Sequence, residues 1–418
     1  VGGYFLNSGD TAWVLICGAL VLFMTPGLAI FYGGMVRTKS TLNMMMMSFS
    51  AIGVTTIIWS LYGYSLAFGE GGAFIGDLKH LGLAGTVNKL IGPDGHQIPV
   101  LAFTMFQLTF AVITIALLSG TIADRAKFSA WLIFVALWVT FVYTPIAHAA
   151  FTSNGFFAKN LGALDFAGGT VVEINSGAAA LALALVLGKR DGFKRDPMRP
   201  HNMPLVLLGA GMLWFGWFGF NAGSALQASS LAASAMINTQ IATACASLSW
   251  IIVEKFREGS ATTLGIASGA IAGAVAITPA CGFVNPIGAL VIGLIAGATS
   301  AWAVTKKFKW GYDDSLDVVG VHGVGGFVGM IGIGILATKL VNDAGRDGLF
   351  RSGKFDLLFN QLTASVITAL YSFCVTFLIA YLIKKTIGFR VAREVEINGL
   401  DTTIHAESAY DVGIYTAR

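Results

Sequence analysis

The sequence predicts an all-α integral membrane protein with eleven transmembrane helices, and three observations support this. Of its 418 residues, 55% are hydrophobic and only 11% are charged, whereas about a quarter of the residues in soluble proteins are charged. Eleven separate stretches are apolar over the roughly 20 residues that a membrane-crossing helix needs. The basic residues flank these stretches and form no nucleic-acid-binding stripe, so nucleic acid is not an expected partner.

The eleven stretches follow one another along the chain. They are 11–34, 44–68, 99–121, 129–150, 168–188, 203–222, 231–254, 262–280, 287–305, 318–338 and 357–383. The 52 glycines suit such helices, because small residues let backbones approach closely within a bilayer. We therefore expect a transmembrane domain over residues 1–390 and a cytoplasmic tail over 391–418.

Charge in the loops predicts the orientation. Alternate loops and the tail hold 19 of the 26 Lys and Arg residues, namely Arg37, Lys39, Arg125, Lys127, Lys189, Arg190, Lys194, Arg195, Arg199, Lys255, Arg257, Lys306, Lys307, Lys309, Lys384, Lys385, Arg390, Arg393 and Arg418. The other seven are Lys79, Lys89, Lys159, Lys339, Arg346, Arg351 and Lys354. By the positive-inside rule the N-terminus is outside and the C-terminus is cytoplasmic. The alternation favours eleven spans over ten or twelve.

An internal repeat is suggested by two equal spacings. Asp165 precedes Glu173 by eight residues, and Asp314 precedes His322 by eight. If the halves are about 11–188 and 203–338, their odd helix count makes the repeat inverted, with a site near the membrane midplane and an extra helix at 357–383. The opposing interpretation is chance, because ladders of small residues recur in membrane helices.

Glu173 and His322 are the clearest candidate functional residues, because an ionisable side chain inside a spanning helix is costly and usually faces a cavity or a partner. Two unrelated polar residues, each satisfied by a backbone carbonyl, are an equally open alternative. Asp165 opens its helix about 12 Å from Glu173. We favour an N-capping role for it over a pull on an incoming cation at the outer mouth.

Aromatic residues are dense near the outer ends of three predicted helices. Phe106, Phe110, Phe151 and Phe220 belong to this set, and Ser224 follows Phe220. Most Phe residues in such a protein fill the core or face lipid. Rings around a pore would nevertheless attract a cation by about 0.5–2 kcal/mol, and Ser224 is either an added acceptor or an ordinary helix-end hydroxyl.

Signatures of soluble enzymes and pumps are missing. The sequence has no GxxxxGK[ST] motif, no HExxH motif and no nucleophile clustered with a base. Its four cysteines are scattered without metal-ligand spacing. We expect no enzymatic activity, no cofactor and no metal. A start at Val1 without Met fits either a removed signal peptide or a trimmed sequence.

Eight strings together resemble the Amt/Mep/Rh family, and specifically its bacterial ammonium transporter branch. They are FYGGMVR, YGYSLAFGEG, ADRAKFSAWLIF, TPIAHAAF, GALDFAGGTVVEIN, WFGFNAGS, ITPACGFV and DDSLDVVGVHGVGG. The resemblance implies a homotrimer with one pore per subunit in the bacterial inner membrane, and transport of ammonium and methylammonium. Phe110 and Phe220 match the family's stacked gate. Phe106 and Ser224 match its outer recruitment site, Asp165 its nearby acidic residue, and His322 the second histidine of its midpore pair.

Two positions depart from the family pattern. Glu173 stands where the first pore histidine is expected, and Phe151 stands where an outer tryptophan is expected. We expect the cation to be recruited against Phe106, Phe151 and Ser224, to lose its proton, and to cross as NH3. The proton would follow a separate route through Glu173 and His322, so that net charge moves. A neutral gas channel and an ammonium sensor are the alternatives.

The tail string REVEINGLDTTIHAESAY resembles the segment through which bacterial ammonium transporters meet PII-type signal proteins. The alternative is a solvated end packed against the inner face of the trimer.

Overall fold

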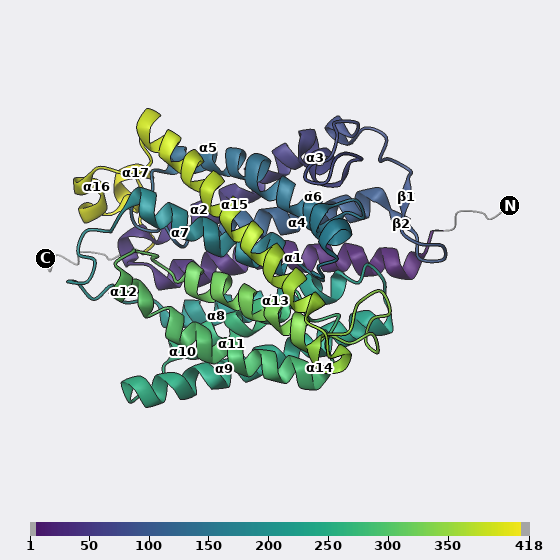
Figure 1. Ribbon diagram of the computed structural model, residues 1–418. Coiled ribbons are helices and arrows are strands. Elements are labelled where there is room, and N and C mark those ends of the chain that lie inside the picture. Colours follow the sequence, from purple (N-terminus) through teal and green to yellow (C-terminus); the bar gives the residue numbers. More distant parts are fainter. Residues whose placement is uncertain (1–5, 411–418) are drawn as a thin grey trace, which may run out of the picture.

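The computed structural model describes residues 6–410 as a bundle of long helices with a short hairpin at one end (Figure 1). The hairpin strands β1 (Leu90–Ile91) and β2 (Ile98–Pro99) pair antiparallel beside the start of α1. The tail helices α16 (Arg393–Asn398) and α17 (Leu400–Ile404) lie at the opposite end. Val1 and Arg418, which enter the predictions above, lie outside the described residues.

Every predicted membrane segment overlaps a helix. In chain order these are α1 (Ser8–Met35); α2 (Thr41–Ile58) with η2 (Trp59–Gly63) and α3 (Tyr64–Phe68); α4 (Val100–Leu118); α5 (Phe128–Trp138) with η4 (Val139–Tyr143) and α6 (Thr144–Phe151); η6 (Gly169–Ile174) with α7 (Asn175–Leu187); α8 (Met203–Gly223); α9 (Ser230–Glu258); α10 (Thr263–Ile277); α11 (Pro286–Ala303); η7 (Val319–Gly323) with α13 (Val324–Leu336); and α15 (Asp356–Thr386). Short connecting elements are η1 (Thr38–Ser40), η3 (Leu81–Leu83), η5 (Phe156–Leu161), α12 (Lys306–Trp310) and α14 (Leu349–Ser352).

Within the described residues, ten helices are long and apolar enough to cross a membrane, and α10 is a shorter apolar helix. The prediction placed this eighth segment at 262–280, but the helix ends at Ile277. Pro279 follows two residues later and has no N–H to continue the helical hydrogen bonds. The chain instead turns through 278–284 before Asn285 caps α11.

The first and sixth predicted helices, α1 and α8, cross closely because glycines line their contact. A Cβ at Gly209 would overlap the backbone of Phe31, and one at Gly34 would lie 2.7 Å from the carbonyl oxygen of Asn202. Such close approach is the usual basis of helix association in lipid, because no hydrophobic force drives helices together there and packing contacts must do so.

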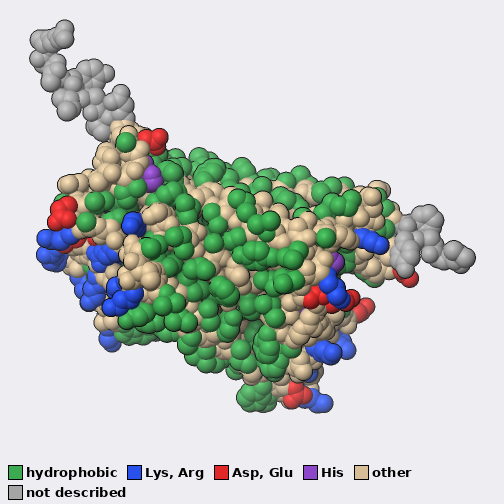
Figure 2. All heavy atoms as spheres, turned by 90° about the horizontal axis from the view of Figure 1, so that it is seen from above, with side chains coloured by type: hydrophobic (Ala, Val, Ile, Leu, Met, Phe, Trp, Pro, Cys, Tyr) green, Lys and Arg blue, Asp and Glu red, His purple; other side chains and the backbone are tan. Residues whose placement is uncertain are grey.

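The outer surface of the bundle is apolar between two charged ends. Figure 2 shows hydrophobic side chains covering the flank, with Lys and Arg gathered mainly at one end. Exposed apolar side chains of α9, α11 and α15 contribute to this surface, including Leu248, Ile252, Ile287, Leu294, Leu370 and Leu378. A soluble monomer would rarely expose so much apolar area, so this flank suits a bilayer. Of the four cysteines, Cys374 is exposed on α15.

Candidate functional site

Asp165 holds the start of the helix that carries Glu173. Its carboxylate accepts hydrogen bonds from the backbone N–H groups of Gly168, Gly169 and Thr170 at 2.7–2.8 Å. These donors have no partner within their own helix, so the carboxylate stabilises the first turn. The predicted N-capping role is confirmed. A part for Asp165 in cation recruitment stays a prediction.

Asp314 performs the same task at the start of η7, the turn that carries His322. It stands five residues before Val319, as Asp165 stands five before Thr170, and its carboxylate accepts the Val319 N–H at 2.7 Å. Its other oxygen accepts the hydroxyl of Thr121 at 2.9 Å. The equal spacings seen in the sequence therefore correspond to equivalent caps on two helices.

Glu173 and His322 lie on the two capped helices and face each other. The Nδ1 atom of His322 is 2.7 Å from Oε2 of Glu173, and both side chains are buried. Each residue belongs to a π-helical turn, η6 or η7, a wide turn that is often found at functional sites. The sequence-based alternative of two unrelated polar residues is wrong, because each is the other's partner.

Glycines four residues beyond each member of the pair make this contact possible. A Cβ at Gly177 would overlap the Cα of Gly323, and a Cβ at Gly326 would lie 2.9 Å from the Cβ of Glu173. Helices that cross this closely bring side chains from opposite halves of the chain into direct hydrogen bonding. Only Oε2 of Glu173 is used, and its buried Oε1 has no protein partner among the described residues.

A small cavity lies beside the pair. Its volume is about 20 Å³, and a cavity of about 10–15 Å³ already holds one water. It is lined by Met24, Leu28, Phe31, Tyr32, Ile113, Leu117, Val172, Glu173, Leu213, Trp217, Phe220, Ile271 and His322. A single small molecule in this space meets mainly apolar walls and the ionisable pair.

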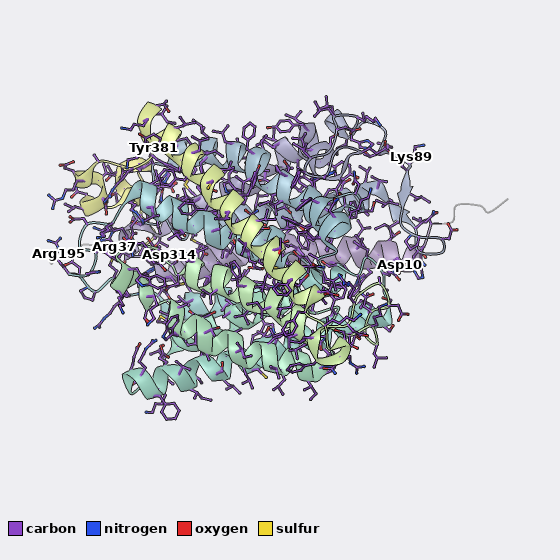
Figure 3. The ribbon with its side chains drawn as sticks, in the orientation of Figure 1. Asp10, Arg37, Lys89, Arg195, Asp314 and Tyr381 are labelled. Carbon is purple, nitrogen blue, oxygen red and sulfur yellow. The ribbon has the colours of Figure 1, made fainter. Side chains whose placement is uncertain are left out.

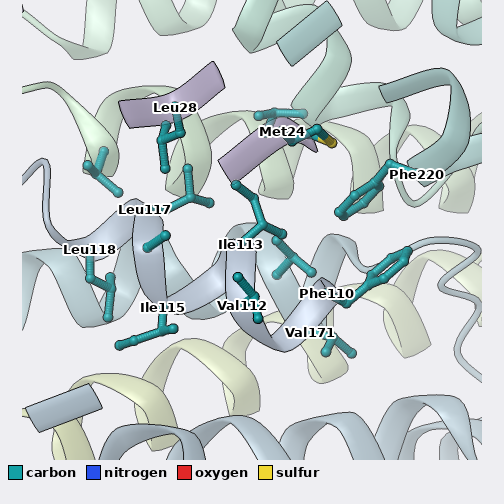
Figure 4. Packing of buried hydrophobic residues seen from close by; sticks show 14 of the residues in the cluster. Met24, Leu28, Phe110, Val112, Ile113, Ile115, Leu117, Leu118, Val171 and Phe220 are labelled. Atoms are coloured by element: carbon teal, nitrogen blue, oxygen red, sulfur yellow. The ribbon is translucent and has the colours of Figure 1, made fainter. Parts of the chain in front are cut away.

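Two stacked rings lie on one side of the cavity, and one of them, Phe220, lines it. Phe110 of α4 and Phe220 of α8 have ring centroids 4.2 Å apart at an interplanar angle of 25°, and both are buried. Figure 4 shows them side by side, with Ile113 and Met24 continuing the apolar packing beyond them. Phe106 contacts Phe110 edge-on at 4.9 Å. Because α4 begins at the hairpin end, Phe106 lies between the stacked rings and that end of the molecule.

Ser224 and Phe151 lie at the ends of their helices. The Ser224 hydroxyl donates to the carbonyl of Phe220 at 2.9 Å, which leaves its oxygen lone pairs available to a donor or cation. Phe151 ends α6 and is half-buried against the core. One turn earlier, His148 contacts the carbonyl oxygens of Ala67 in α3 and of Gly72 in the loop that follows, and so ties α6 to both.

Because the sequence resembles ammonium transporters, we predict that Phe151→Trp tightens the apparent affinity for ammonium by about threefold, since an indole attracts a cation more strongly than a phenyl ring. Selectivity should not change, since the stacked rings are untouched. Half-saturation of an ammonium-dependent current measures the effect. An unchanged or weaker half-saturation would place Phe151 outside the recruitment site.

Most residues that line the cavity were not predicted from the sequence, and two of them, Tyr32 and Trp217, carry polar atoms. Tyr32 donates its hydroxyl to the carbonyl of Leu117 at 3.2 Å, and Trp217 donates its indole N–H to the hydroxyl of Thr278 at 2.8 Å. Their polar atoms are thus satisfied by protein, so both present mainly apolar surface to the cavity. Tyr32 lies in FYGGMVR and Trp217 is the first residue of WFGFNAGS, but nothing in their spacing indicates a shared cavity.

This geometry suits the passage of a small solute. The stacked rings and apolar walls leave room for only a small species, and a buried carboxylate and imidazole are in direct contact beside it. The apolar helices, the cavity and the buried pair together indicate the class of membrane transporters.

The comparisons with known proteins agree on one family. The sequence profile of the Ammonium Transporter Family matches residues 12–410. An ammonium transporter of Mycobacterium tuberculosis is 51% identical over 98% of this chain and 91% of its own length. The solved structure of Saccharomyces cerevisiae Mep2 is 34% identical, with a TM-score of 0.85 over 93% of this chain and 88% of that one. A structure named Sensor Amt Protein is 28% identical, with a TM-score of 0.85 over 94% and 97%. The chain belongs to the Ammonium Transporter Family.

Proposed function

We propose that this protein carries ammonium and methylammonium across the bacterial inner membrane by separating the cation into NH3 and a proton. The observation that carries the proposal is the isolated Glu173–His322 pair at a water-sized cavity behind two stacked rings. A lone cation in such apolar surroundings is strongly unfavourable. Neutral NH3 carries no such penalty and is similar in size to water.

In this mechanism the cation rests outside Phe110 and Phe220 and gives up its proton there. The aromatic face of Phe106, with Phe151 and the Ser224 oxygen, supplies the attraction that partly replaces water. NH3 then passes the rings and the cavity. The proton follows a polar route through Glu173 and His322, so that net charge moves.

We expect ammonium to produce a saturable inward current in proteoliposomes and potassium to produce almost none. Potassium cannot lose its charge, so the full cost of a buried cation applies to it. Methylammonium should also give a current, because it too releases a proton. Equal currents for potassium and ammonium would contradict the mechanism.

Two other functions predict different results in the same recording. A neutral gas channel would accelerate NH3 entry, seen as a rise in internal pH, without any current. A sensor, which the name of one solved relative brings into consideration, would bind ammonium with little flux of either kind. A current that scales with ammonium uptake excludes both.

The proposed assembly is a homotrimer with one pore in each subunit. The proposed topology has eleven spans arranged as an inverted repeat of five plus five and a final helix α15, with the N-terminus outside. The close crossings at α1–α8 and at η6–η7 support two related halves, and the basic end that carries α16 and α17 suits the cytoplasm.

The tail is a candidate docking element for a PII-type signal protein. Asp401 in α17 is buried and accepts the N–H groups of Leu42 and Asn43 at 2.9 and 2.8 Å, so it caps α2. Ile397 and Ile404 remain exposed beside it. Deleting everything after Arg390 would also remove the α2 cap, so point changes at exposed positions are the better test.

We predict that Ile397→Glu abolishes copurification with a PII-type protein and leaves ammonium current and particle size unchanged. A charge on this exposed position opposes an apolar contact without disturbing the buried Asp401 cap. Thr402→Glu, on an exposed position of α17, is the matched control. Undiminished copurification of the Ile397 variant would move the interface to the cytoplasmic loops.

A further inference from the structure

A hollow of about 430 Å³ lies where the loop after α7 meets the tail. The loop contributes Lys189 and Arg195, and the tail contributes Arg390 and Arg393. Figure 3 shows Arg195 at the end of the bundle that carries α16. Neither the cavity nor the ammonium pathway described above involves these residues.

Two of the cations at the hollow are neutralised within the protein. Arg190 is buried and binds both carboxylate oxygens of Asp313 at 2.8–2.9 Å. Burial alone would raise the pKa of Asp313, but hydrogen bonds from Arg190 and the charges of Arg125 and Arg190 lower it. Arg390 binds buried Glu396 at 2.7 Å. These two ion pairs are held within the protein at the base of the hollow.

The remaining charges are unbalanced. Arg195 and Arg393 share a single carboxylate, Asp191, at 3.9 and 3.2 Å, and the two guanidinium side chains are 71% and 70% exposed. Lys189 is exposed and has no ion-pair partner within the part of the chain that the structure describes. Among the residues that line the hollow, three exposed cations thus share one carboxylate, Asp191. The carboxylate of Asp196 lies against Gly192 at the rim, and the hollow still keeps an excess of positive charge open to an anion.

The hollow also adjoins apolar surface at the end of a spanning helix. Its first lining residue, Lys189, stands two positions after Leu187, the last residue of α7. Phe193, which lines it, stacks on Phe308 at 5.8 Å, and Phe308 and Trp310 are largely exposed. Exposed aromatic and basic side chains together are typical of the level of lipid headgroups.

We propose that this hollow binds a phosphate-bearing anion, and that Lys189, Arg195 and Arg393 hold its charge. The shared chemistry fits the headgroup of an anionic phospholipid or a soluble organic phosphate, and the apolar rim favours the lipid. A bound phosphate would join the loop between the two halves to the tail.

The test compares Lys189→Gln/Arg195→Gln/Arg393→Gln with Arg199→Gln, which removes a charge from the same loop outside the hollow. Phosphatidylglycerol retained by the purified protein is counted by native mass spectrometry, and glycerol 3-phosphate is titrated in a separate arm. We expect affinity to fall by about fivefold for each charge removed, with Arg199→Gln unchanged.

Loss of phosphatidylglycerol alone assigns a lipid site, and an equal loss of glycerol 3-phosphate binding assigns a soluble ligand. Elution at the wild-type volume shows that the variants fold, and binding to the wild type should weaken as salt rises. If the triple variant binds both probes as Arg199→Gln does, the proposal is wrong. This result does not depend on ammonium transport.

Discussion

Replacing Glu173 by Gln is expected to lower the ammonium current about a hundredfold at neutral pH, the typical loss when a positioned proton-transfer group is removed. Gln keeps the size of the side chain and can still contact His322, but it cannot accept a proton. Particle size and yield should match the wild type. The current in proteoliposomes, normalised to inserted protein, measures the effect.

The two members of the pair are 2.7 Å apart, so their protons belong to the pair and not to either residue. His322→Ala should therefore also reduce the current. Glu173→His should retain transport, because a second imidazole again provides a titratable partner. If Glu173→Gln carries the wild-type current, the carboxylate is only a hydrogen-bond partner and the proposed proton route is wrong.

Replacing Gly177 by Ala is expected to abolish most of the current for a different reason. The new methyl group would overlap the backbone of Gly323, which cannot rotate away as a side chain can. The helices η6 and η7 would separate, and the contact between Glu173 and His322 would lengthen. Overpacking of this kind costs about 1–3 kcal/mol, so the thermal midpoint should also fall.

Gly53→Ala is the matched control, because Gly53 also lies in a spanning helix but has no atom within 4 Å of its added Cβ. Ala at that position should be neutral or slightly stabilising, since it favours the helix. A Gly177→Ala protein with normal current and thermal midpoint would show that the crossing has room for a methyl group. The requirement for glycine there would then be wrong.

Much of the fold could be predicted from the sequence because a bilayer imposes simple local demands. Each crossing must be a continuous apolar helix whose backbone groups are satisfied internally. Segments such as 203–222 can therefore be recognised from their composition alone. Charged side chains are expensive in such segments, which is why Glu173 and His322 stood out. The eighth segment was placed too long because Pro279 ends the helix within an otherwise apolar run.

The sequence by itself determined the class of protein, the approximate spans and the few residues able to carry a proton. The tertiary structure alone decided that residues 149 positions apart form one hydrogen-bonded pair, and that Tyr32 and Trp217 line the cavity beside it. It also placed Asp401 of the tail as a cap on α2. The physical reason is that apolar content and charge are local properties of a segment, whereas pairing, capping and cavity shape depend on how closely distant helices cross.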